Sequence, residues 1–130
     1  MSRLLLVITA LAELAAALAL LCVPGLVFEL LLATSRASAE ALLVGKIAGA
    51  ALLALGIACW LARDDSGSSS LRGVLCGMLA YNLGVAAVLG YAGSLLRMNG
   101  VLLWPAVAMH SGLAVWCAIC LRPTASPRAP

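Results

Sequence analysis

Four apolar runs divide this chain, and each has about the 20 residues that a helix needs to cross a hydrocarbon core about 30 Å thick. The runs cover residues 4–23, 41–61, 71–91 and 101–121. The segments between them contain Pro, Gly, Ser and charged residues, which are typical of turns and loops. This alternation predicts four membrane-spanning helices joined by shorter connections.

The composition indicates the same class of protein. Hydrophobic residues make up 65% of the 130 residues, charged residues make up 10%, and the mean hydropathy is +1.14. An ordinary soluble domain has about 25% charged residues. We therefore expect one all-α domain over residues 1–122, an integral membrane bundle of four transmembrane helices. The Pro-rich segment 123–130 has little apolar surface to bury, so we expect a disordered tail there.

The positions of Lys and Arg predict the orientation, because cytoplasmic loops of membrane proteins retain more positive charge. One face of the expected bundle carries five basic residues near the helix ends, namely Arg3, Arg63, Arg72, Arg122 and Arg128. The opposite face carries Arg36 and Arg97, and also Lys46 if its side chain extends to that surface. We expect both termini in the cytoplasm and a multi-pass protein of the cell inner membrane.

The connection over residues 24–40 is the longest of the three and is partly apolar. Its segment LVFELLLA, residues 26–33, can form a short helix in the outer interface with Glu29 facing water. It can also extend the first span. We favour the interfacial helix, because Pro24 and Gly25 interrupt the span before this segment begins.

Polar residues occur near the middle of three spans. At about 1.5 Å of rise per residue, Glu13, Asn82 and His110 all lie near the midplane of the bilayer. Lys46 lies a few residues toward the outer face. Small residues share the helical face of Glu13 and of His110, and small residues mark close helix contacts in membranes. We therefore expect these polar side chains to point into the bundle as one cluster.

An unpaired ionised carboxylate at this depth would cost at least about 2.5 kcal/mol. Glu13 must therefore be neutral or paired, either with Lys46 or by a hydrogen bond to His110 or Asn82. One interpretation is a proton-carrying or ligand-binding site. The other is a polar clasp that fixes the helix register while Lys46 extends to the outer interface. The sequence leaves both open.

Two further patterns concern helix contacts. The motifs GKIAG and GVLCG place Gly45 with Gly49 and Gly73 with Gly77, a spacing that is typical of close helix packing in membranes. Tyr81 adds a hydroxyl near the midplane that needs a hydrogen-bond partner. We expect Tyr81 to pack against a neighbouring helix and not to line a cofactor pocket.

Several classes of function find no support in the sequence. The basic residues are scattered and few aromatic residues lie among them, so the net charge of +3 does not indicate a nucleic-acid partner. The CAIC motif at residues 117–120 ends an apolar helix, where a reactive thiol is not expected, and it lacks a second pair of metal ligands. We expect no metal, no cofactor and no enzymatic activity. The expected partner is the lipid bilayer, with a second copy of the chain or another membrane protein left open.

The chain resembles the small four-helix bacterial inner-membrane proteins of the DoxX-like families. The resemblance rests on the Pro-containing outer segment, on GKIAGAALLALGIACWLAR at residues 45–63, where Lys46 matches a basic residue near the start of the run, and on GVLLWPAVAMHSGLAVW at residues 100–116. It implies a polytopic inner-membrane protein with an accessory or small-solute-handling role. No quinone or thiol site is carried over to residues of this chain.

A second resemblance is to the small multidrug resistance transporters, which also have four short helices and a membrane-embedded glutamate in the first, matched by Glu13. It implies a proton-coupled transporter of hydrophobic cations. Those proteins surround the carboxylate with aromatic residues, whereas the first run here contains none, and Lys46 would repel a cation. This function is the alternative to the DoxX-like one.

Overall fold

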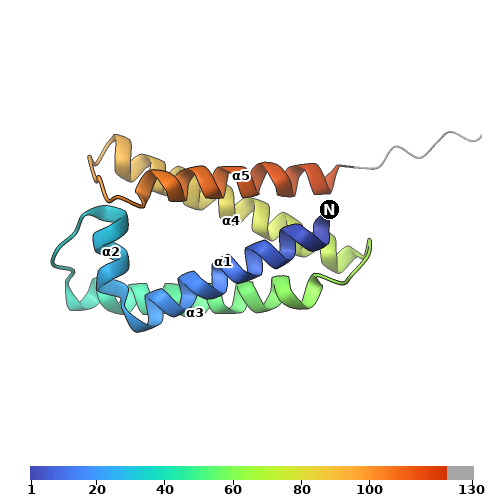
Figure 1. Ribbon diagram of the computed structural model, residues 1–130, viewed down its shortest axis with the longest axis horizontal. Coiled ribbons are helices and arrows are strands. Elements are labelled where there is room, and N and C mark those ends of the chain that lie inside the picture. Colours follow the sequence, from blue (N-terminus) through green and yellow to red (C-terminus); the bar gives the residue numbers. More distant parts are fainter. Residues whose placement is uncertain (123–130) are drawn as a thin grey trace, which may run out of the picture.

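The computed structural model describes residues 1–122, which form five α-helices (Figure 1). The helices are α1 (Ser2–Cys22), α2 (Pro24–Leu32), α3 (Ala39–Ala62), α4 (Ser69–Ser94) and α5 (Leu103–Leu121). Four of them, α1, α3, α4 and α5, are long and apolar enough to cross a membrane. The all-α prediction is confirmed. The expected disordered tail, 123–130, lies outside the described residues.

Serine side chains mark the starts of two long helices. The Ser38 hydroxyl oxygen accepts a hydrogen bond from the backbone N–H of Ala41 at 3.2 Å, and α3 begins directly after it. Ser68 accepts in the same way from the N–H of Leu71 at 3.1 Å, before α4. Such caps satisfy amide groups that a helix start leaves unpaired. In α5, Pro105 lies near the start, where its missing N–H is tolerated.

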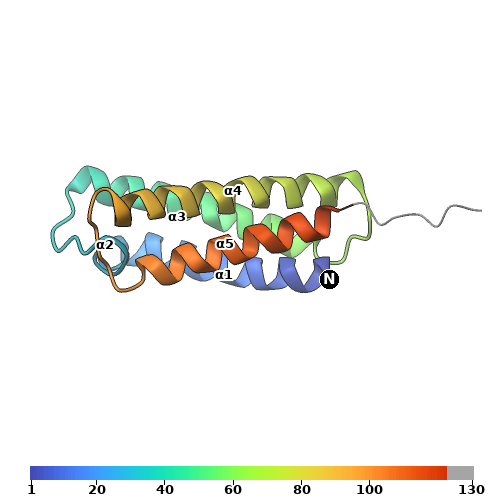
Figure 2. The same cartoon turned by 90° about the horizontal axis from the view of Figure 1, so that it is seen from above.

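The long helices pack as two pairs, α1 along α3 and α4 along α5 (Figures 1 and 2). Glycines permit the close approach of α1 and α3. A Cβ added at Gly49 would lie 3.0 Å from the carbonyl oxygen of Ala17, and one added at Gly56 would lie 3.0 Å from Cγ of Leu14. Gly49 belongs to the GKIAG motif.

The GVLCG motif behaves differently. Gly73 and Gly77 are exposed on α4, and a Cβ added at either would meet no atom of the described residues within 4 Å. Leu71, Leu75 and Met78 are the side chains of this segment that turn into the core. Because the apolar side chains take the inner face, the glycines fall on the outer face. The expected packing at Gly73 and Gly77 therefore does not occur within residues 1–122.

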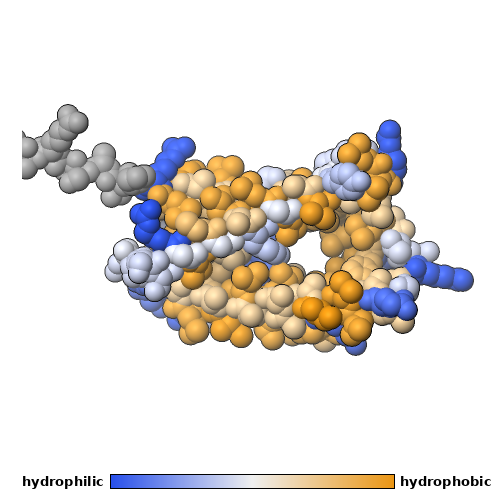
Figure 3. Space-filling model, turned by 180° about the vertical axis from the view of Figure 1, so that it is seen from behind, coloured by the Kyte–Doolittle hydropathy of each residue, from blue (hydrophilic) through white to orange (hydrophobic). Residues whose placement is uncertain are grey.

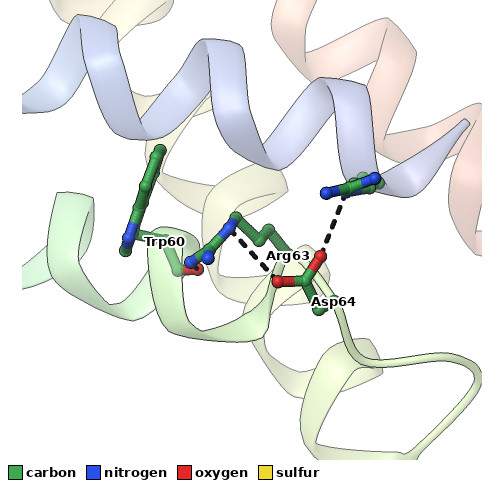
Figure 4. A network of polar contacts seen from close by, with 4 residues as sticks. Trp60, Arg63 and Asp64 are labelled. Atoms are coloured by element: carbon green, nitrogen blue, oxygen red, sulfur yellow. Dashed lines mark hydrogen bonds and ion pairs between the residues drawn. The ribbon is translucent and has the colours of Figure 1, made fainter.

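The two pairs close on each other at the end that holds the N-terminus and the α3–α4 loop. Their shared core there is apolar and contains Leu5, Leu6, Ala10, Cys59, Leu71, Leu75, Met78, Leu113 and Cys117. At its edge, Asp64 pairs with Arg3 at 3.0 Å and with Arg63 at 3.3 Å, and Arg63 stacks over the ring of Trp60 (Figure 4). Arg3 and Asp64 are largely exposed and Arg63 is partly exposed, so the ion pairs contribute little free energy.

At the opposite end the short helix α2 lies across the bundle and spans both pairs (Figures 1 and 2). Val23 separates α2 from α1. The ring of Phe28 packs on Gly45 of α3, where an added Cβ would lie 2.7 Å from Cζ. On the other side, the N–H of Leu102 donates to the carbonyl oxygen of Leu30 at 2.9 Å. A helix thus occurs where the sequence predicted an interfacial one.

Candidate functional site

A cavity of about 660 Å³ lies between the two helix pairs, on the α2 side of the shared core. Figure 3 shows an opening that passes between the pairs toward the end where α2 lies. Its volume falls within the roughly 300–1,000 Å³ of small-molecule sites. Its walls are aliphatic, and the described residues that line it include three polar side chains: Glu13, Tyr81 and His110. α2 covers the end of the cavity away from the shared core with Leu26, Val27, Leu30 and Leu31.

Glu13 lies on α1 and is almost fully buried, with 3% of its surface exposed. Its Oε2 accepts a hydrogen bond from the hydroxyl of Tyr81 on α4 at 3.2 Å. The expected direct partners were His110 and Asn82, and no hydrogen bond from Glu13 to either occurs among residues 1–122. The difference arises because Tyr81 projects from α4 between Glu13 and His110. The bond links the two helix pairs.

The ring of Tyr81 also contacts His110 on α5. The ring centroids are 5.7 Å apart and the planes meet at 80°, an edge-to-face arrangement. Tyr81 therefore touches both other polar residues of the cavity. It packs against a neighbouring helix, as expected, but it also lines the cavity, which the sequence did not indicate. The useful signal was its hydroxyl, which required a polar partner at this depth.

Asn82 supports His110 from outside the cavity. It is fully buried, and its Nδ2 donates to the carbonyl oxygen of Met78 at 2.7 Å. This contact orients the amide so that Oδ1 faces Nδ1 of His110 at 2.8 Å. Since Oδ1 can only accept, Nδ1 of His110 must carry the hydrogen. The remaining nitrogen, Nε2, has no hydrogen-bond partner among the described side chains.

Lys46 lies apart from these three residues. Its side chain is exposed, in a shallow depression of about 500 Å³ that Cys22, Pro24 and Gly25 also line. In the part of the chain that the structure describes, it pairs with no carboxylate. The helix rotation explains this position, because the neighbouring Gly45 takes the inward face of α3. The ion pair between Lys46 and Glu13 that the sequence left open is not found.

The cysteines do not add to the site. All five are free, and Cys59 and Cys117 are buried in the apolar core. Within residues 1–122, no group of three or more His, Cys, Asp or Glu side chains could hold a metal ion. The polar chemistry of the cavity therefore comes from a carboxyl, a phenol and an imidazole group.

Comparison with protein families, curated proteins and solved structures finds no match to this chain. The residues that line the cavity, and the groups that orient them, are therefore the basis for assigning a function.

Proposed function

We propose that this chain is a multi-pass inner-membrane protein that holds a small apolar solute in the cavity and catalyses no reaction. This role corresponds to the small-solute-handling type that the DoxX-like resemblance implies. The supporting observation is the cavity itself: aliphatic walls with three polar groups, Glu13, Tyr81 and His110. Sites for small molecules commonly combine an apolar lining with a few polar groups that orient the ligand.

The proposed orientation has both termini in the cytoplasm. Arg3, Arg63 and Arg72 belong to the closed end, and cytoplasmic ends of membrane helices are rich in such residues. The opposite end carries α2, whose Glu29 is exposed and can face water. In this orientation α2 lies in the outer interface, and the cavity occupies the outer half of the membrane.

A binding assay with a matched pair of variants tests the proposal. Tritiated dodecane, naphthalene and dodecanol are offered to the protein in phosphatidylcholine nanodiscs, with empty nanodiscs as the background. Ala106 lines the cavity, whereas Ala108 is exposed on the same helix outside it. We expect saturable binding of at least one probe to the wild type, weakened at least about fivefold by Ala106→Trp and unchanged by Ala108→Trp. Absence of saturable binding for all three probes would refute the proposal.

A second candidate function is proton-coupled transport of a hydrophobic cation, as in the small multidrug resistance transporters. The observation in its favour is the contact between Tyr81 and Glu13, which supplies from α4 the aromatic ring that α1 lacks. Lys46 is exposed and apart from the cavity, so it would not repel a cation there. An efflux assay with ethidium and the Glu13→Gln variant tests it. No transport, or transport indifferent to the substitution, removes this candidate.

A further inference from the structure

Glu13 has no cation beside it. The ion pairs in the described part of the chain join Asp64 to Arg3 and to Arg63, at the closed end of the bundle. An ionised carboxylate that is almost fully buried in an apolar membrane segment, without a cation, is far less favourable than the neutral acid. In a chain that spans a bilayer, Glu13 is therefore expected as the neutral acid. Because Oε2 accepts from Tyr81, the acid proton belongs on Oε1, which can donate to a ligand.

His110 offers the complementary group. Its Nδ1 donates to Asn82, so the neutral ring leaves the lone pair of Nε2 as an acceptor. His110 and Glu13 line the same cavity, and each contacts Tyr81, which lies between them. The polar part of the cavity thus presents one donor and one acceptor and carries no net charge. A hydroxyl group, which both donates and accepts, complements this pair.

The rest of the cavity indicates where such a ligand would come from. α2 covers the outer end, held there by the bond from Leu102 to the carbonyl of Leu30. The space-filling view shows that the space is instead open between the helix pairs (Figure 3). That opening faces the side of the bundle, and a chain spanning a bilayer would present it to lipid. The ligand would therefore enter from the hydrocarbon phase, which favours a molecule with an apolar chain.

We infer that the cavity binds an uncharged amphiphile with an apolar chain and a single hydroxyl group. The hydroxyl donates to Nε2 of His110 and accepts from the carboxyl group of Glu13, while the chain lies along the alanine and leucine walls. This inference rests on the proposed solute-binding function and adds the chemical class of the solute. It differs from the transporter alternative, which needs an ionised Glu13 and a cationic ligand.

Four tritiated probes with the same 12-carbon chain separate these possibilities in nanodiscs: dodecanol, dodecane, dodecyltrimethylammonium and dodecanoate. Since two net hydrogen bonds are worth about a tenfold gain or more, we expect dodecanol to bind at least about tenfold more tightly than the others. Glu13→Leu removes one of the two hydrogen bonds and leaves the one to His110, so it should lower the preference for dodecanol over dodecane by about fivefold. Glu13→Gln, which keeps a donor, should retain most of the preference. Dodecane binding reports that each variant is folded.

The outcomes test the hydroxyl assignment separately from the solute-binding function on which it rests. Equal affinity for all four probes, lost in Ala106→Trp, would overturn the hydroxyl assignment and leave the solute-binding function standing. Tightest binding of dodecyltrimethylammonium, abolished by Glu13→Gln, would also overturn it and would favour the transporter. No saturable binding of any probe would refute both the assignment and the function on which it rests.

Discussion

The hydroxyl of Tyr81 lies 3.2 Å from Oε2 of Glu13, and this hydrogen bond joins α4 to α1 where the shared core ends and the cavity begins. One turn toward the closed end, Ala10 and Met78 of the same helices already belong to the apolar core. The bond therefore forms part of the cavity wall that borders the shared core. It also brings together two helices that belong to different pairs.

Substitutions at Glu13 test how much its hydrogen bond to Tyr81 contributes to stability. Glu13→Gln keeps an acceptor for the Tyr81 hydroxyl, so we expect little change in the free energy of unfolding. Glu13→Leu leaves that hydroxyl without its partner and should cost about 1–3 kcal/mol. Unfolding in mixed micelles measures both. The exposed Glu29 provides the control, because Glu29→Leu should change stability by less than about 0.5 kcal/mol. Equal stability of the Gln and Leu variants would show that the hydrogen bond from Tyr81 does not contribute to the free energy of unfolding.

The tautomer of His110 can be measured directly. The Asn82 amide, oriented by the Met78 carbonyl, requires the hydrogen on Nδ1. Nitrogen NMR of the labelled protein near neutral pH should therefore show a protonated Nδ1 and an unprotonated Nε2. Asn82→Leu should release this preference and lower the free energy of unfolding by about 1–3 kcal/mol. A hydrogen on Nε2 in the wild type would contradict the tautomer that the Asn82 contact requires.

Alanine substitutions at Gly100 and at Gly73 should change the free energy of unfolding in opposite directions. A Cβ at Gly100 would overlap the backbone of Leu30 and Leu31, so Gly100→Ala should push α2 away and cost about 1–3 kcal/mol. Gly73 lies inside α4 with open space around it, and Gly73→Ala should stabilise by up to about 1 kcal/mol. Thermal unfolding of the two variants checks both signs. Tolerance of alanine at Gly100 would mean that α2 does not approach the α4–α5 connection closely.

Much of the fold follows from local sequence properties. The length and apolar character of the runs determine the four long helices, and the serines at 38 and 68 account for two of their starts. The level of Glu13, Asn82 and His110 along the bundle follows from the constant rise of a helix. Pro24 and Gly25 indicate a break after α1, which the structure places at Val23.

Which side chains meet across the bundle could not be predicted from local sequence in the same way. Whether Glu13 meets Tyr81 or His110 depends on how α4 and α5 rotate and tilt relative to α1. The inward face of α3 is taken by Gly45, so its neighbour Lys46 turns outward. Both glycine motifs have the same spacing, yet only long-range packing determines which one faces a helix. The cavity depends on α2 bridging the two pairs, which no local pattern encodes.

Labelling a single introduced cysteine tests the orientation. Ser68 lies at the start of α4, at the closed end that we assign to the cytoplasm. A cysteine at this position, Ser68→Cys, in a chain whose native cysteines are replaced, should resist an impermeant thiol reagent in intact cells and react after permeabilisation. A cysteine placed at the exposed Arg36 should show the reverse pattern. Rapid labelling of the Ser68→Cys protein in intact cells would invert the topology.

Photo-cross-linking tests most directly whether the cavity is a binding site. A 12-carbon alcohol with a diazirine in mid-chain is activated on the protein in nanodiscs, and the modified residues are mapped by mass spectrometry. We expect adducts on cavity residues such as Leu20, Leu52 and Met109, with their yield reduced at least about fivefold in Ala106→Trp but not in Ala108→Trp. Adducts confined to residues on the exposed surface such as Leu11 and Leu18, with yields indifferent to Ala106→Trp, would contradict the site.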